Sequence, residues 1–147
     1  MGSVLATWQF WALLSALFAA LTAIFAKLGV EHVGSDFATF IRTIVILAAL
    51  GAILVASGQW QPPASVSGRT YLFLVLSGLA TGASWICYFR ALKLGDAARV
   101  ATLDKLSVVL VAVFGVMFLG EKLSMANWLG VLMIAGGVIL LTTRIWS

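Results

Sequence analysis

Five long apolar runs constrain the fold of this chain more than any other feature of its sequence. Each is about 20 residues long, the length of α-helix that crosses the ~30 Å hydrocarbon core of a bilayer. A spanning segment must pair its backbone groups inside lipid, and none of these runs alternates as a barrel strand would. The sequence therefore predicts an all-α membrane protein, a single bundle of five transmembrane helices over residues 8–28, 37–57, 71–92, 100–120 and 127–143.

The composition agrees with a membrane protein and excludes several function classes. Of 147 residues, 63% are hydrophobic and 10% are charged, whereas a soluble domain carries about 25% charged residues. The net charge of +4 is small and unevenly distributed, so it bears on topology rather than on nucleic acid. The single cysteine, Cys87, and the single histidine, His32, complete no disulfide, metal site or catalytic group. We therefore expect no enzymatic activity, no cofactor, no metal and no nucleic-acid partner.

Lysine and arginine are unequally divided between the two membrane faces. Because the number of spans is odd, the two termini lie on opposite faces of the membrane. Face B carries the first and third loops and the C-terminus, and face A carries the N-terminus and the second and fourth loops. Face B has the larger set of cations: Lys27, Arg42, Arg90, Lys93, Arg99, Lys105 and Arg144, against Arg69 and Lys122 on face A. The positive-inside rule then predicts a cytoplasmic C-terminus and an external N-terminus in the inner (cell) membrane. The first run is too long, and lacks the basic start, for a cleaved secretion signal.

Charged side chains lie inside the apolar runs, at a similar depth from face B. Asp104 and Lys105 lie one full turn inside the fourth run, and Arg42, Arg90 and Lys27 lie near the same face in other runs. Charges at membrane depth are costly and usually face a bundle interior or a water-filled cavity. Three of these cations, Lys27, Arg90 and Lys105, are also long enough to extend to the headgroups as anchors. Asp104 needs a neighbouring cation, for which the candidates are Arg42, Arg90 and Lys105. The pair would be either a structural ion pair or part of the wall of a substrate cavity.

Two further runs carry stripes of small and polar residues. In the third run, one face contains Gly78, Thr81, Gly82, Trp85, Tyr88 and Phe89 at three- and four-residue spacing. Trp85 and Tyr88 offer aromatic surface with a polar edge, suited to stacking or to a cation–π contact. In the fourth run, Ser107 follows Asp104 on the same face. Either a cavity or helix packing explains these stripes.

The fifth run is suited to packing. It has no ionisable group before Arg144, and it contains Gly130, Gly136 and Gly137, which let helix backbones approach closely. Gly78 and Gly82 in the third run form a comparable G-x-x-x-G pair. We expect these five glycines to serve helix packing within the chain or contact in a homodimer.

Several stretches resemble a known transporter unit. They are "ALLSALFAALTAIFAKLG", "ATFIRT", "LFLVLSGLATGASWICYFRALKLGDAARVATLDKLSVVLVAVFGVMFLGEKL" and "GVLMIAGGVILL". The chain resembles a single EamA-type unit of the drug/metabolite transporter superfamily, whose larger members join two inverted units and export amino acids, drugs or metabolites. The resemblance implies a secondary transporter with a substrate path between two units, hence a homodimer. One departure is that proline is expected before the Leu-Asp-Lys segment, where this chain has Thr102 and Leu103.

The charge pattern narrows the expected substrate. The resemblance to this superfamily invites comparison with small multidrug resistance proteins, which keep an acidic residue in the first span for cationic drugs; the first run here has none. The charged layer is net positive, which favours a small anionic or zwitterionic metabolite as the substrate, and the resemblance favours its export. Asp104 is a candidate for proton coupling. The expected partners are membrane lipid, the small-molecule substrate and a second copy of the chain. A non-transporting accessory subunit or a lipid-linked flippase component is the alternative.

Overall fold

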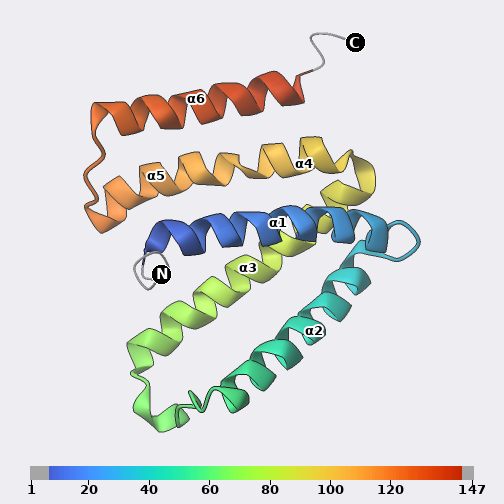
Figure 1. The fold of residues 1–147 in the computed structure, drawn as a ribbon, viewed down its shortest axis with the longest axis vertical. Coiled ribbons are helices and arrows are strands. Elements are labelled where there is room, and N and C mark those ends of the chain that lie inside the picture. Colours follow the sequence, from blue (N-terminus) through green and yellow to red (C-terminus); the bar gives the residue numbers. More distant parts are fainter. Residues whose placement is uncertain (1–6, 144–147) are drawn as a thin grey trace. The chain divides into compact units, whose positions relative to one another are not determined.

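Helices account for the regular structure of the chain. The computed structural model describes residues 7–143, in which no strand occurs (Figure 1). The α-helices are α1 (Trp8–Val30), α2 (Ser35–Ala56), α3 (Gly68–Leu94), α4 (Ala97–Asp104), α5 (Leu106–Leu119) and α6 (Met125–Thr142), with one 3₁₀ turn, η1 (Pro63–Ser65). Within these residues five helical segments are long and apolar enough to cross a membrane, α4 and α5 together making the fourth. The predicted all-α fold with five spans is confirmed; Arg144, assigned to face B, lies outside the described residues.

The helices extend beyond several of the predicted span ends, by up to three residues. The predicted limits follow the edges of apolar composition, whereas a helix continues as long as its terminal backbone groups find partners. At the start of α6, the hydroxyl of Ser124 accepts a hydrogen bond from the Asn127 N–H at 3.2 Å and caps the helix. At the start of α2, the extension brings Asp36 into the first helical turn.

The fourth predicted span, 100–120, is interrupted. Lys105 separates α4 from α5, and its N–H donates to the Thr102 carbonyl at 3.1 Å in an i→i+3 bond. This tighter bonding pattern replaces the regular α-helical ladder for one turn, and such tightening within a long helix often marks a hinge. At its other end α5 stops at Gly120, whose φ of 68° allows the Glu121 N–H to donate to the Gly115 carbonyl at 3.1 Å.

The described chain forms two compact units, with the boundary between Leu94 and Gly95. Unit 1 contains α1, α2 and α3, and α3 contacts both of the others. Its core lies where α1 ends, α2 begins and α3 ends, which is the face-B end of all three helices. The buried residues there are Ala23, Ala26, Val30, Thr39, Phe89 and Leu92. The Thr39 hydroxyl donates to the Ser35 carbonyl at 2.9 Å, so this buried polar group is satisfied within its own helix.

Unit 2 contains α4, α5 and α6, and α6 packs along both α4 and α5. Its buried residues are Gly115 on α5 and Val138 on α6. The side chain of Glu121 folds over Gly115 and occupies the space that a Cβ atom would need. Glycine at this position therefore makes room for the return of the chain after α5.

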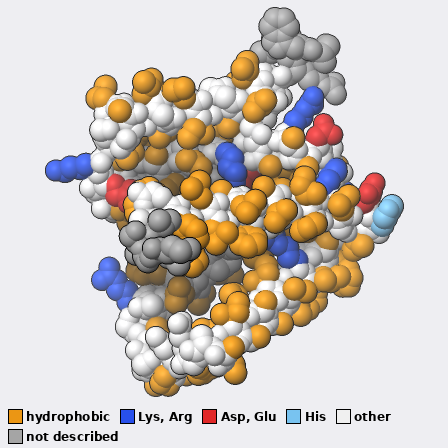
Figure 2. Space-filling view, in the orientation of Figure 1, with side chains coloured by type: hydrophobic (Ala, Val, Ile, Leu, Met, Phe, Trp, Pro, Cys, Tyr) orange, Lys and Arg blue, Asp and Glu red, His pale blue; other side chains and the backbone are white. Residues whose placement is uncertain are grey.

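Many large apolar side chains are exposed on both units, and hydrophobic side chains are spread over the face seen in Figure 2. Water does not favour so extensive an apolar surface, but the hydrocarbon of a bilayer does. Their exposure therefore agrees with helices that face lipid. That the five segments form a single domain stays a prediction.

Candidate functional site

Arg42, two turns into α2, is held by aromatic side chains of α3. Its guanidinium carbon lies 4.2 Å from the centroid of the Trp85 ring and 5.5 Å from that of Phe89. Trp85 and Phe89 are four residues apart, so they stand one above the other on the same face of α3. A guanidinium at these distances is attracted by the negative faces of the rings. No ion pair joins Arg42 to a carboxylate of residues 7–143, and the two rings help to position this cation.

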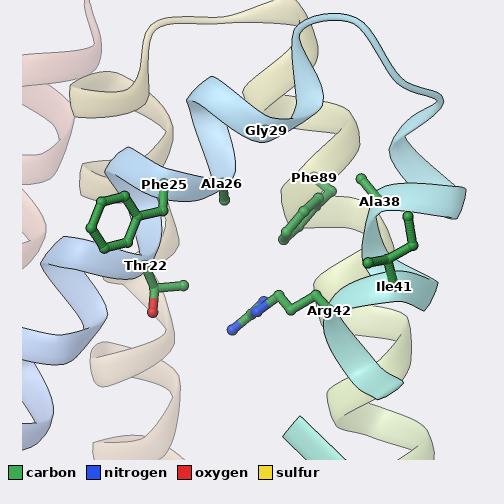
Figure 3. A pocket seen from close by; sticks show the side chains of 8 residues that line it. All are labelled: Thr22, Phe25, Ala26, Gly29, Ala38, Ile41, Arg42 and Phe89. Atoms are coloured by element: carbon green, nitrogen blue, oxygen red, sulfur yellow. The ribbon is translucent and has the colours of Figure 1, made fainter. Parts of the chain in front are cut away.

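A pocket of about 360 Å³ adjoins Arg42 within unit 1. The residues that line it come from all three helices: Thr22, Phe25, Ala26 and Gly29 from α1; Ala38, Ile41 and Arg42 from α2; and Phe89 from α3. Figure 3 shows the Arg42 guanidinium directed from α2 toward α1, in the space between Thr22 and Phe89. The pocket therefore combines one cation with walls that are otherwise almost entirely apolar.

Small side chains keep this pocket open. Ala26 and Gly29 lie one turn apart on α1, and Ala38 lies on α2. A Cβ atom added to Gly29 would have no heavy atom within 4 Å, so α1 leaves space there instead of packing against α2. The larger side chains of Phe25, on α1, and Ile41, on α2, lie at opposite sides of the pocket (Figure 3).

An ion pair joins α2 to α3 at the face-B end of unit 1. Arg90 donates from Nε to Asp36 Oδ1 at 3.0 Å and from Nη2 to Oδ2 at 2.7 Å. This two-bond arrangement fixes the relative orientation of both side chains, because the planar guanidinium matches the carboxylate. Both carboxylate oxygens of Asp36 are therefore engaged.

Two lysines reinforce the same end through backbone carbonyls. Lys27 of α1 donates from Nζ to the Leu92 carbonyl of α3 at 2.7 Å. Lys93 of α3 donates to the Val33 carbonyl, in the loop between α1 and α2, at 2.8 Å. A cation near the last carbonyls of a helix satisfies unpaired acceptors and complements the helix dipole. The Asp36–Arg90 pair and these two bonds, called the face-B contacts below, hold the ends of the three helices together.

The structure places five of the sequence-predicted site residues in unit 1. Arg42 and Trp85 are in contact, and Tyr88 is half-buried on the same face of α3. Lys27 and Arg90 belong to the face-B contacts rather than to the pocket lining. Their predicted part in a substrate path stays a prediction.

Asp36 and most of the pocket lining were missed by the sequence analysis. Asp36 was assigned to a connecting loop, although an acidic residue beside the predicted start of a span, at the same face as Arg90, is a usable signal for an ion pair. The sequence does not distinguish the pocket residues Phe25, Ala38 and Ile41 from their neighbours. An apolar side chain inside an apolar run gives the same sequence pattern whether it faces lipid, another helix or a cavity.

The remaining predicted residues lie in unit 2. Lys105 Nζ is 3.7 Å from Asp104 Oδ2, an ion pair between chain neighbours at the break between α4 and α5. Lys105 is one of the three cations expected beside Asp104, and both side chains are exposed. Ser107 is also exposed, in the first turn of α5.

The glycines predicted to serve packing present open surface within their units. A Cβ atom added to any of them would meet no heavy atom within 4 Å: Gly78, Gly82, Gly130, Gly136 and Gly137. Within residues 7–143, therefore, no neighbouring segment packs closely on these positions. Contact through them with a second copy stays a prediction.

Comparison with known proteins finds matches over most of the chain. Residues 6–143 match the EamA-like transporter family. The chain is 71% identical, over 135 residues, to a protein of Sinorhizobium sp. described as an uncharacterized transporter in the cobO 3′ region; the match covers 92% of this chain and 96% of that protein. No solved structure matches the chain.

Proposed function

Because the chain belongs to the EamA-like transporter family, we propose that it is a secondary transporter that exports a small anionic or zwitterionic metabolite. Its five apolar helices make it a multi-pass membrane protein. Residues 7–143 contain no group of three or more His, Cys, Asp or Glu side chains that could hold a metal ion.

The Arg42 site is the observation that carries the proposed substrate charge. A guanidinium at membrane depth needs compensation, and here it has two aromatic rings but no carboxylate among residues 7–143. Aromatic rings attract the positive charge, but they do not satisfy the five N–H donors of the guanidinium as acceptor oxygens would. An anion entering the adjacent pocket would supply the missing acceptor and the missing charge.

The pair of Asp104 and Lys105 supports a coupling role. An intramembrane carboxylate that gains and loses a proton is a common coupling element in transporters. Asp104 lies at the break between α4 and α5, where a change in its charge would act on a weakened helical turn. Proton coupling through Asp104 is therefore part of the proposal.

The proposed assembly is a homodimer in the inner membrane, with the C-terminus in the cytoplasm. One five-span chain offers few helices to enclose a solute path, and the five open glycines provide surfaces on which a second copy could pack closely. The excess of lysine and arginine on face B supports the orientation. A reporter fused to the C-terminus tests it, and a signal from outside the cytoplasm would contradict it.

Counterflow in proteoliposomes tests the transport proposal. Vesicles containing the purified chain are loaded with anionic, zwitterionic or cationic metabolite pools, and exchange of the labelled species is followed. We expect exchange with anionic or zwitterionic pools and loss of that exchange in Arg42→Gln.

The matched control for this experiment is Arg69→Gln. Arg69 lies over Phe73 at 5.8 Å, at the opposite end of α3 and outside the pocket, so its loss should leave exchange intact. Exchange of cations alone would overturn the proposed substrate class. Absence of all exchange by a folded protein would favour the accessory-subunit or flippase-component alternative.

A further inference from the structure

The proposed function does not distinguish between anionic and zwitterionic substrates. The residues that line the pocket of unit 1 can discriminate between these two classes. We propose that this pocket binds a monocarboxylate with a small apolar body, with the carboxylate on Arg42, and that it rejects the zwitterion of the same shape. This inference rests on the proposed function and narrows its substrate class. Its three supports are the charge of the pocket, the geometry of Arg42 and the nature of the walls.

The charge of the pocket is that of one cation. Arg42 is the single charged residue among those that line it. Asp36 is the one carboxylate in α1, α2 and α3, and both of its oxygens accept hydrogen bonds from Arg90. The other carboxylate of residues 7–94, Glu31, lies exposed beyond the end of α1. Within residues 7–94, the pocket therefore offers a charged partner for a carboxylate and no counter-charge for an ammonium group.

The geometry of Arg42 favours a carboxylate. The contact with Trp85, with 4.2 Å between the guanidinium carbon and the ring centroid, holds the planar guanidinium in place. The donors along the edge of that plane match the two oxygens of a carboxylate in a two-bond arrangement. One guanidinium neutralises one negative charge, so a dianion would keep an unpaired charge among apolar walls. The site is thus matched to a monoanion.

The walls favour an apolar body. Phe25, Ile41 and Phe89 surround the space with carbon, and the Thr22 hydroxyl is the one neutral polar side chain in the lining. An ammonium group placed there would lose its hydration without gaining a counter-charge, which is strongly unfavourable. The volume of about 360 Å³ is near the lower end of the ~300–1,000 Å³ typical of ligand sites, so the body is small.

Two ligands that differ by one group provide the test. 3-Phenylpropanoate and L-phenylalanine share a ring, a chain and a carboxylate, and only phenylalanine carries an ammonium group. Binding of labelled 3-phenylpropanoate to the full chain is measured in phosphatidylcholine nanodiscs, with unlabelled competitors. We expect phenylalanine to compete at least about tenfold more weakly, and the uncharged 3-phenylpropanamide to compete as weakly or worse. This comparison uses the native chain, so it does not depend on any variant folding.

Variants then assign the binding to Arg42. Arg42→Gln should weaken 3-phenylpropanoate binding by about tenfold or more, and Arg42→Lys, which keeps the charge but loses the planar fork, should lie between. Arg69→Gln, which removes the other arginine–aromatic contact of α3, should leave binding unchanged. Equal weakening by Arg42→Gln and Arg69→Gln would overturn the assignment.

The remaining outcomes separate this inference from the proposed function. Equal or tighter competition by phenylalanine would overturn the inference, while anion exchange in proteoliposomes would still uphold the transport proposal. Selective 3-phenylpropanoate binding without exchange of any pool would support the site and refute transport. Repeating the assay with anionic phosphatidylglycerol identifies the source of the anion: if this lipid abolishes binding, Arg42 takes a lipid headgroup and the free-monocarboxylate proposal fails.

Discussion

The contact between Arg42 and Trp85 gives a prediction whose magnitude follows from the structure. The guanidinium carbon is 4.2 Å from the ring centroid, well inside the ~6 Å within which cation–π attraction is significant, and both side chains are half-buried. Attraction of this kind contributes about 0.5–1 kcal/mol at exposed sites and about 2 kcal/mol when desolvated. We therefore expect a coupling free energy of about 1–2 kcal/mol between the two side chains.

A double-mutant cycle measures this coupling. The free energy of unfolding is determined in mixed detergent micelles for the native chain, Arg42→Gln, Trp85→Leu and the double variant. The departure of the double variant from the sum of the single variants isolates the pairwise contribution. Phe89, at 5.5 Å, stays in place in all four proteins, so part of the attraction on Arg42 survives the loss of Trp85.

A second cycle on Arg69 and Phe73 is the matched control. That pair is separated by 5.8 Å, and Phe73 is 58% exposed, so its coupling should be less than half as large. A coupling below about 0.3 kcal/mol for Arg42 and Trp85 is within the range of simple additivity. Such a value, or one equal to that of the control pair, would refute the conclusion that Trp85 positions Arg42.

Three further predictions concern other parts of the chain. Asp104→Asn should remove most of the transport rate while leaving the unfolding midpoint nearly unchanged, because it deletes a titratable group and keeps its shape; equal loss of both would identify Asp104 as purely structural. Charge reversal of either Asp36 or Arg90 should lower the unfolding midpoint, and the double reversal should restore it, since the pair is joined by two hydrogen bonds; a double variant no better than the singles would argue against the pair. Gly137→Leu should convert the solubilised dimer to a monomer with unchanged helicity; if Leu at both Gly130 and Gly137 leaves the dimer intact, the interface lies on another helix.

The helices of this protein were predictable because the bilayer leaves a polypeptide few choices. A run of about 20 apolar residues must satisfy its backbone within itself, so helix formation follows from composition without knowledge of any neighbour. The exact helix ends were less predictable. Helices α2 and α6 begin directly after Gly34 and Ser124, a few residues before the starts that apolar composition predicts. The break at Lys105 was not predicted, since the run on both sides of it stays apolar.

The candidate site was predictable only in part. Arg42 was predictable because a charged side chain is unusual inside an apolar run. Trp85 was predictable because tryptophan usually lies at the membrane interface and not within a span. Asp104 and its neighbouring cation Lys105 were identified for the same reason as Arg42. The lining residues Phe25 and Ile41 could not be identified in this way, because hydropathy gives the same value to a side chain in lipid and to one at a cavity wall.

The sequence by itself determined that this chain crosses the membrane as helices, and at which depth each charge lies along its helix. Only the tertiary structure decided the partners: Asp36 for Arg90, and Trp85 for Arg42. The physical reason is that depth is fixed by counting residues at 1.5 Å each along one helix. Contact also depends on the rotation and crossing of two helices, which are set by the packing of many side chains at once.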